Sequence, residues 1–414
     1  MTVKNQIIKD TQIKKFCLYG FLKNCKFFEP YLLLFLLQQG MNLFQIGILI
    51  AVREVVANVF EIPSGIIADH YGRKKEMLLC FSFYIFSFIA FFFATTFAIA
   101  VIGMVFFGLG EAFRSGTHKA MIYTYLDIND WQSEKSFVYG RTRACSLTGS
   151  AVSSLLGVVF ILLLPSASYI FLLSIIPYIA DFFLLMTYPK ALDKGDKVQS
   201  TTLKELVCDM VSSVKTSKNL LALLVEGGLA DAIYSYMKDL IQPIMEYIIL
   251  GSGVALIASL SLDTNVKIAL GLVYALMNLV GAIFSKRSYL FKGERTATQC
   301  LLIYHVAMAV ISGLLAITLQ LPLLVCLLYI LIYMFQNVRK PLYLEELDQH
   351  TNKAHRATIL STSSQLKSIL FMVFAPLLGY LGDCYGIGAI MFVLSFCFLF
   401  SIPLLFNKPT KEKK

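Results

Sequence analysis

Charged side chains inside long apolar stretches are the residues of this chain whose types and spacing could do chemistry. One stretch carries Lys23, Lys26 and Glu29, and another carries Glu111 and Arg114, with neighbours three residues apart in each. Side chains three apart share a face of a helix, so each set forms a cluster of mixed charge. Clustered Lys and Arg can bind a carboxylate or a phosphate, and Arg can do so through two hydrogen bonds. These residues predict a binding site for an anionic or zwitterionic solute; ion pairs that only hold helices together are the alternative.

Four polar residues at roughly helical spacing in a later stretch extend the predicted solute site: Tyr329, Tyr333, Gln336 and Asn337. Packing between helices is the alternative role for them. A carboxyl group in apolar surroundings holds its proton more readily than one in water, so it can couple solute movement to a proton gradient. The candidates for this coupling are Glu29, Glu111 and Asp231.

Helices that cross a membrane must position these side chains, and the composition predicts such helices. The chain has 414 residues, of which 57% are hydrophobic and only 15% charged, and its mean hydropathy is +0.71. A soluble domain is closer to half apolar and a quarter charged, so the excess must face lipid. A helix needs about 20 apolar residues to span a bilayer. Twelve stretches qualify: residues 16–38, 43–66, 77–95, 98–122, 137–163, 167–188, 220–248, 267–290, 297–319, 321–344, 357–381 and 386–406.

The distribution of Lys and Arg predicts the orientation of these spans. The net charge is +10, and most of the 36 basic residues lie in segments that twelve spans place on one side of the membrane. The segments on the other side hold only Lys267. Basic residues favour the cytoplasmic side, so we expect both termini in the cytoplasm. Charge scattered along one face is not a nucleic-acid footprint. The expected partners are therefore a small-molecule solute and the lipid bilayer, without nucleic acid, and we expect a monomer.

The spans divide six and six around the longest polar stretch. This pattern predicts an N-terminal six-helix bundle at 1–190, a cytoplasmic linker at 191–219 and a C-terminal six-helix bundle at 220–414. The nine Cys show no Cys-x-x-Cys spacing, so we expect neither a disulfide framework nor a metal site. We also expect no cofactor, because an ion or proton gradient would supply the driving force.

A polar turn between the second and third spans carries the most specific pattern in the chain. Residues 65–75 read Gly-Ile-Ile-Ala-Asp-His-Tyr-Gly-Arg-Lys-Lys. This order resembles the Gly-x-x-x-Asp-x-x-Gly-Arg-Lys/Arg signature that major facilitator superfamily (MFS) transporters carry between their second and third membrane helices. The placement of charges is similar too. Spans 1, 4, 7 and 10 carry many and spans 3, 6, 9 and 12 almost none, as in the cavity-lining and lipid-facing helices of that family.

The resemblance implies an all-α membrane protein of two pseudo-symmetric six-helix bundles. Such a protein would move its solute by alternating access across the bacterial cytoplasmic (inner) membrane. The resemblance also implies a gating role for the residues that match the signature: Gly65, Asp69, Gly72, Arg73 and Lys74. In the family the glycines permit close approach and a tight turn. The Asp and Arg pair across the inner faces of the two halves, near helix 11, which favours the state closed to the cytoplasm.

Two departures from the family narrow the expected function. Drug exporters of the family carry Arg-x-x-Gln-Gly in the fourth helix and Gly-Pro-x-x-Gly-Gly in the fifth, and neither pattern occurs here. We therefore expect a secondary transporter that moves a small polar or charged solute together with protons. Proton-coupled efflux of drugs or other amphipathic compounds remains an alternative. A membrane solute sensor and a membrane-embedded transferase also remain, although the chain shows no obvious catalytic constellation and we expect no enzyme.

Overall fold

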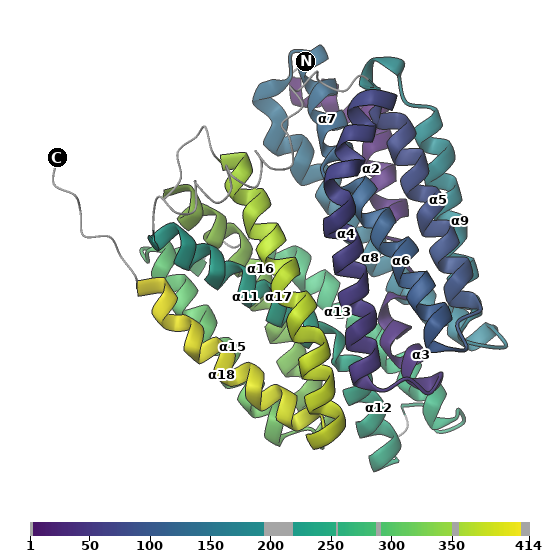
Figure 1. Ribbon diagram of the computed structural model, residues 1–414, viewed down its shortest axis with the longest axis vertical. Helices are drawn as coiled ribbons and strands as arrows, with labels where there is room; N and C mark the ends of the chain where they lie inside the picture. Colours follow the sequence, from purple (N-terminus) through teal and green to yellow (C-terminus); the bar gives the residue numbers. More distant parts are fainter. Residues whose placement is uncertain (1–2, 194–217, 254–255, 287–290, 350–355, 407–414) are drawn as a thin grey trace. The chain divides into compact units, whose positions relative to one another are not determined.

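The computed structural model (Figure 1) describes residues 3–193, 218–253, 256–286, 291–349 and 356–406. Within these ranges the regular structure is helical and contains no strand. Eleven stretches of the described chain are long and apolar enough to cross a membrane, and they correspond to the second to twelfth predicted spans. The prediction of an all-α membrane protein is therefore confirmed. The orientation of the termini and the count of twelve spans stay predictions.

The first predicted span is not one continuous helix, and that expectation was wrong. The chain instead forms α2 (Thr11–Lys23), a 3-10 turn η1 (Glu29–Tyr31) and α3 (Leu32–Gln38). Pro30, which has no N–H to donate, lies in the first turn of η1.

The break separates the charged residues that the sequence had placed on one face. Lys23 is the last residue of α2, Lys26 lies between the two helical segments, and Glu29 begins η1. The three side chains therefore do not follow a single helical stripe.

The fourth and seventh predicted spans are also divided. Helix α6 (Phe97–Arg114) is followed by α7 (Thr117–Ile128), and the break contains Gly116 with φ +77°. Glycine adopts this left-handed conformation at little cost, so it lets the chain change direction there. In the seventh span α11 (Lys218–Asp239) gives way to α12 (Ile241–Ser252). Three of the charge-rich spans are thus interrupted next to their polar residues.

The chain forms two compact units, of which the first comprises Met1–Gln39 and Val52–Ser200. Besides α2, α3, α6 and α7 it contains α1 (Val3–Lys9), part of α4 (Leu43–Tyr71), α5 (Arg73–Phe92), η2 (Gln132–Glu134), α8 (Lys135–Leu163), α9 (Tyr169–Met186) and η3 (Lys190–Leu192). Helix α5 packs against α6 and α9, and α2 packs against α8 and α9. Aromatic rings fill this core: Phe88 and Tyr178 are fully buried with their centroids 4.8 Å apart.

The second unit comprises Gly40–Ala51 and Thr201–Lys414. Besides α11, α12 and the start of α4 it contains α13 (Leu262–Lys286), α15 (Ala297–Ile317), α16 (Pro322–Gln349), α17 (Arg356–Tyr385) and α18 (Ile387–Phe406). Helix α15 packs against α18 and α16, α11 packs against α17, and α13 packs against α16.

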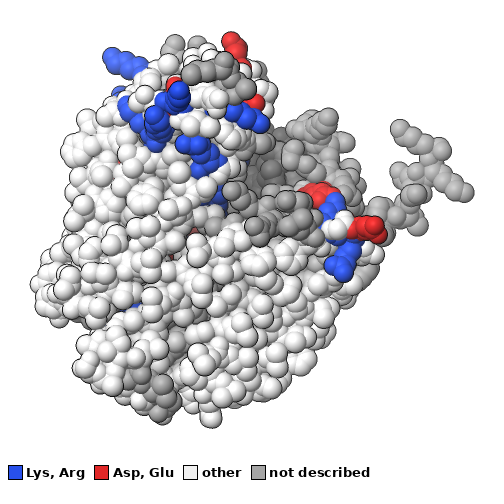
Figure 2. Space-filling view, turned by 180° about the vertical axis from the view of Figure 1, so that it is seen from behind, with Lys and Arg blue, Asp and Glu red and all other residues white. Residues whose placement is uncertain are grey.

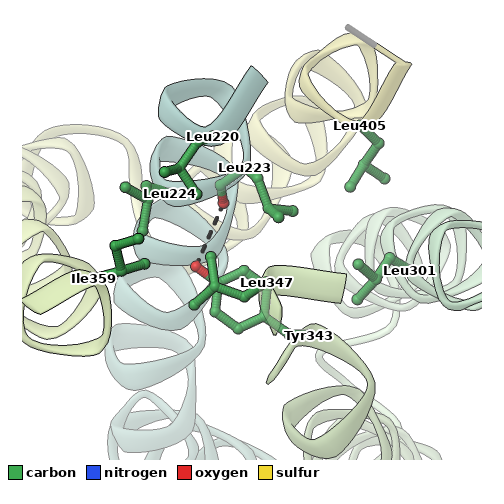
Figure 3. Packing of buried hydrophobic residues seen from close by; sticks show 8 residues of the cluster. All are labelled: Leu220, Leu223, Leu224, Leu301, Tyr343, Leu347, Ile359 and Leu405. Carbon is green, nitrogen blue, oxygen red and sulfur yellow. Dashed lines mark hydrogen bonds between the residues drawn. The ribbon is translucent and has the colours of Figure 1, made fainter. Parts of the chain in front are cut away.

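Leucine side chains make up most of a buried cluster in the second unit, as Figure 3 shows. The buried cluster comprises Leu220, Leu223, Leu224, Leu301, Tyr343, Leu347, Ile359 and Leu405. The ring of Tyr343 lies among these residues, and its hydroxyl donates to the carbonyl oxygen of Leu223 at 3.4 Å. The cluster therefore joins α11, α15, α16, α17 and α18 around one aromatic side chain.

The first turn of α4 is held by α17 inside the second unit. The backbone N–H groups of Leu43 and Phe44 donate to the carboxylate of Asp383 at 2.9 Å and 2.8 Å. The N-terminal N–H groups of a helix have no partner within the helix, so this carboxylate satisfies two of them. The predicted division at 1–190, 191–219 and 220–414 stays a prediction, and most of that linker lies outside the described residues.

The surface of the described residues agrees with a membrane protein. On the face shown in Figure 2, charged side chains gather at one end of each unit, and the remaining described surface is almost free of them. Large apolar side chains stand exposed, among them Leu323 at 87% and Phe400 at 78%. Apolar surface of this extent is expected to face lipid.

Candidate functional site

A cavity of about 280 Å³ lies inside the first unit. The end of α2, the junction of α6 with α7 and the first turns of α8 surround it. Gly20 lets α2 approach α8, because a Cβ there would lie only 2.7 Å from Ser146 Oγ and 3.1 Å from the carbonyl oxygen of Thr142. A glycine in α2 and small polar residues in α8 thus set the distance between the two walls.

Four basic residues line this cavity: Lys23, Arg114, Lys119 and Arg143. The other described residues that line it are Phe16, Tyr19, Gly20, Asn24, Gly116, His118, Ile122, Tyr139, Thr142 and Ser146, so the lining contains no carboxylate. We call the four the basic cluster. An excess of one sign of charge in a concave, partly dehydrated site concentrates its field on a ligand of the opposite sign. The arrangement can bind a carboxylate or a phosphate.

The basic cluster includes an ammonium group that has no direct ion pair among the described residues. Among the described residues, Lys23 Nζ makes no hydrogen bond and no ion pair, although the backbone oxygen of Lys23 accepts from the hydroxyl of Tyr178 at 2.9 Å. Lys119 Nζ lies 5.3 Å from the ring centre of Tyr139. An aromatic ring attracts a cation without cancelling its charge, so Lys119 remains able to attract an anion.

Stacked rings form the buried wall of the cavity. The rings of His118 and Tyr19 are stacked with centroids 3.6 Å apart, and Phe16 packs edge-on against His118 at 5.5 Å. His118 Nε2 is 3.2 Å from the hydroxyl of Tyr188. These contacts fix the imidazole in one orientation, so the wall is rigid.

Of the five charged residues first predicted to bind solute, Lys23 and Arg114 line the cavity, whereas Lys26, Glu29 and Glu111 do not. Lys26 Nζ lies over the ring of Phe107 at 5.0 Å from its centre. The charges of Glu29 and Glu111 both act on this ammonium group. These three residues therefore lie together in a second, mixed-charge part of the first unit.

Glu111 faces a basic residue of α4 that the sequence left without a partner. Arg53 Nε lies 3.7 Å from Glu111 Oε2, and Arg53 Nη2 lies 2.7 Å from Glu54 Oε1. One guanidinium thus lies between carboxylates of α4 and α6. Such a contact stabilises the packing of the two helices. A role of Glu111 in proton coupling stays a prediction.

A charge network around the fully buried Arg339 and Glu226 lies in the second unit. Arg339 Nη2 donates to Glu226 Oε1 at 3.0 Å, and Arg339 Nη1 donates to Asp231 Oδ1 at 2.8 Å. The same Asp231 oxygen accepts from Gln336 Nε2 at 2.7 Å. Tyr304 completes the chain of hydrogen bonds by donating to Gln336 Oε1 at 2.7 Å. The network ties α11, α15 and α16 together.

The remaining polar residues of α16 have structural partners within the unit. The hydroxyl of Tyr329 donates to the carbonyl oxygen of Met237 at 3.1 Å, and Asn337 Nδ2 donates to the carbonyl oxygen of Tyr333 at 2.8 Å. The ring of Tyr333 packs edge-on against Tyr234 at 5.8 Å. Contact of these side chains with a solute stays a prediction.

Sequence reasoning missed Arg339 and His305 as members of this network. Arg339 follows Gln336 by three residues and so shares its face of α16, but only the uncharged polar residues of this span were predicted to contact the solute. The signal that would have found it is the acidic pair Glu226 and Asp231, which needs a positive partner inside the membrane. His305 lies in the ninth span, which the sequence analysis described as almost free of charged residues.

The signature turn is anchored inside the first unit. Gly72, with φ +99°, separates α4 from α5, and the carboxylate of Asp193 accepts from the backbone N–H of Lys74 at 2.8 Å. The guanidinium of Arg73 donates to Thr124 Oγ1 of α7 at 2.8 Å. A Cβ on Gly65 would meet no atom within 4 Å.

Part of the predicted gate lies outside the described structure. The side chain of Asp69 is not among the described ones, so its expected pairing with Arg73 stays a prediction. The observed contacts show that the turn begins α5 with a capped end, in agreement with the tight turn expected at Gly72.

Comparison with known proteins gives concordant results. The sequence profile of the Major Facilitator Superfamily matches residues 24–366. The chain is 22% identical over 385 residues to the uncharacterized MFS-type transporter YxaM of Bacillus subtilis (strain 168), covering 91% of this chain and 90% of that protein.

Solved structures share the fold at low sequence identity. The nucleoside transporter NupG superposes with a TM-score of 0.74 at 13% identity, covering 99% of this chain and all of that one. The human organic anion transporter MFSD10 (TETRAN) superposes with a TM-score of 0.64 at 14% identity, covering 96% of this chain and all of that one.

Proposed function

The chain belongs to the Major Facilitator Superfamily and is a multi-pass membrane transporter rather than an enzyme, and we propose that it moves a small anionic solute. The observation that carries this proposal is the basic cluster: among the described residues, four cations and no carboxylate line one cavity of the first unit. The solute would cross the cytoplasmic membrane by alternating access, driven by a proton gradient.

The physical argument starts from the cost of unneutralised charge. Lys23, Arg114, Lys119 and Arg143 repel one another, and the Lys23 ammonium has no partner among the described residues. A bound carboxylate or phosphate removes this repulsion and replaces the lost water of the cations with charge-assisted hydrogen bonds. A cationic or apolar solute would not remove the repulsion among the four cations.

The size of the cavity and its neutral groups limit the solute further. A volume of about 280 Å³ is close to the lower end of ligand sites, which hold small metabolites. Thr142 and Ser146 add hydroxyl groups to the lining. The best-fitting class is therefore a carboxylate- or phosphate-bearing metabolite with further polar substituents.

The first experiment is a thermal-shift screen of the purified protein with matched compounds. The panel contains a carboxylate, a phosphate ester, the neutral amide of the same carboxylate and a quaternary amine of similar size. A ligand that binds only the folded state raises the unfolding temperature, and the rise grows as the ligand concentration increases relative to its Kd. We expect anions to raise it and their neutral analogues to leave it unchanged.

Substitutions of residues that line the cavity test whether the rise in unfolding temperature comes from binding there. Lys23→Gln and Arg114→Gln should each lower affinity for the anion by about tenfold or more, which corresponds to about 1.4 kcal/mol. The matched control is Lys135→Gln. Lys135 is a cation of the same unit that pairs with Asp127 at 3.4 Å and does not line the cavity.

Other results would favour the other functions. Stabilisation by amphipathic cations but not by anions would contradict the proposal and point to efflux of amphipathic compounds. Binding of an anion without counterflow of the labelled compound in proteoliposomes would point to a sensor.

A further inference from the structure

A histidine of α15 and an acidic residue of α11 meet in the interior of the second unit. His305 Nε2 lies 3.1 Å from Glu226 Oε1, and both side chains are fully buried. Neither residue was among the predicted proton-coupling groups. Their contact limits which atoms of the two side chains can carry a hydrogen.

The second ring nitrogen shows which tautomer His305 adopts. His305 Nδ1 lies 2.8 Å from the carbonyl oxygen of Leu301, one turn earlier in α15. A carbonyl oxygen only accepts, so Nδ1 must donate and must carry a hydrogen. A neutral imidazole would then have no hydrogen on Nε2.

A neutral His305 facing an ionised Glu226 is therefore unfavourable. The lone pair of Nε2 would then lie only 3.1 Å from a carboxylate oxygen, with both side chains fully buried. One proton removes the conflict: it makes the ring an imidazolium beside a carboxylate, or the carboxylate a carboxylic acid beside a neutral ring. Glu226 Oε2 has no hydrogen-bond partner among the described residues, which leaves that oxygen free to carry a proton as well.

The surroundings supply only part of the positive charge that Glu226 needs. Other charged or titratable groups around the network are Asp231 from α11, Tyr304 from α15, Arg339, Lys340 and Tyr343 from α16, and Lys367 from α17. The guanidinium of Arg339 is divided between Glu226 and Asp231, and the two lysines act on Asp231. From α18 the pair receives only the uncharged ring of Phe398, 6.0 Å from that of His305.

We propose that Glu226 and His305 share one exchangeable proton, and that this proton moves together with the solute. Uptake forms one N–H or O–H bond within the pair, and release breaks it and passes the proton to water. An anion that travels with a proton carries less net charge across the membrane, which lowers the electrostatic cost of the step. The existence of the shared proton stands independently, whereas its coupling to the solute rests on the proposed function.

The shared proton can be tested without any solute. The full-length protein is labelled with ¹⁵N-histidine, purified and titrated by NMR over a pH range that spans neutrality. The chain has five histidines, so His305 is assigned from the spectrum of His305→Gln or from variants lacking the others. We expect Nδ1 to carry hydrogen throughout. We also expect the hydrogen that Nε2 carries in the unsubstituted protein to be missing from Nε2 in Glu226→Gln at the same pH.

A matched control comes from the same helix. Ser312 is a fully buried polar residue of α15 whose hydroxyl donates to the carbonyl oxygen of Met308 at 2.7 Å. Ser312→Ala should leave the His305 titration unchanged. If Glu226→Gln does not fold, the unsubstituted protein still tests the proposal. Its spectrum shows whether the proton between Glu226 and His305 is present.

Two results would overturn the proposal: one would exclude the shared proton, and the other would exclude its coupling to the solute. A His305 ring without hydrogen on Nε2 at every pH, together with no infrared band of a protonated carboxyl that disappears in Glu226→Gln, would exclude the shared proton. In proteoliposomes with an anion found by the thermal-shift screen, we expect Glu226→Gln to lose accumulation driven by a pH gradient while keeping counterflow. Unchanged accumulation would exclude the coupling and leave the proposal of anion transport intact.

Discussion

Arg339 Nη2 lies 3.0 Å from Glu226 Oε1 in the interior of the second unit, with both side chains shielded from solvent. The same guanidinium binds Asp231, so one residue of α16 neutralises two carboxylates of α11. A buried ion pair contributes little compared with an apolar pair of the same size, but breaking it on one side is costly.

This asymmetry predicts the behaviour of single and combined variants. Arg339→Gln should lower the free energy of unfolding by about 3–5 kcal/mol, because it removes the guanidinium from the fully buried Glu226 and from Asp231. The combination Arg339→Gln with Glu226→Gln should recover part of that loss. Thermal unfolding of the purified proteins in one detergent measures both, and a combined effect equal to the sum of the single effects would contradict the pairing.

Asp181 of α9 should tolerate neutralisation. Its side chain is fully buried, and neither carboxyl oxygen has a hydrogen-bond partner among the described residues. An unpaired carboxylate in such surroundings is strongly disfavoured relative to its neutral form. Asp181→Asn should therefore change the free energy of unfolding by less than about 1 kcal/mol.

Asp231→Asn provides the comparison for Asp181, since it weakens the bond from Arg339 and should cost clearly more. A large loss of stability in Asp181→Asn, measured by thermal unfolding, would show that Asp181 is ionised and paired in the folded protein.

The packing of α2 on α8 should depend on Gly149. A Cβ at this position would lie 2.4 Å from the carbonyl oxygen of Phe21, a backbone atom that cannot move aside. Gly149→Ala should therefore destabilise the protein by about 1–3 kcal/mol and weaken anion binding, because the two helices frame the cavity.

Gly140 in the same helix is the matched control for Gly149. No atom lies within 4 Å of its ideal Cβ, so Gly140→Ala should stabilise by about 0.5–1 kcal/mol through the lower entropy of the unfolded chain. Equal effects of the two substitutions on the unfolding temperature would argue against close packing at Gly149.

Asp193 should stabilise the beginning of α5. Its carboxylate accepts from the backbone N–H of Lys74 at 2.8 Å, as an N-terminal helix cap does. Asp193→Ala should cost about 1 kcal/mol, and Asp193→Asn should cost less because the amide oxygen still accepts. Hydrogen exchange of the amide of Lys74 reports this directly, and unchanged protection in Asp193→Ala would contradict the cap.

The sequence predicted the membrane helices because their signal is local. A run of apolar residues such as 387–405 identifies a span without knowledge of any contact. The breaks in the first, fourth and seventh spans were not predicted. Gly116 and Pro30 marked two of them, but a glycine or proline inside an apolar run is also common in unbroken membrane helices.

The site was predicted only in part because its partners are far apart in the chain. Lys23 and Arg114 were predicted to bind the solute, whereas Lys119 and Arg143 were not. Arg143 lies in α8, and the close approaches at Gly20 and Gly149 bring that helix to α2. Contacts of this kind depend on packing, which hydropathy and spacing do not contain.

Counterflow of a labelled anion in proteoliposomes tests the central claim most directly, with Lys23→Gln, Arg114→Gln and Lys135→Gln compared at equal protein density. We expect the first two variants to lose about tenfold or more of the affinity for the anion, and Lys135→Gln to match the unsubstituted protein. Equal counterflow in all three variants, or exchange of the neutral amide as fast as the carboxylate, would show that the basic cluster does not bind the solute.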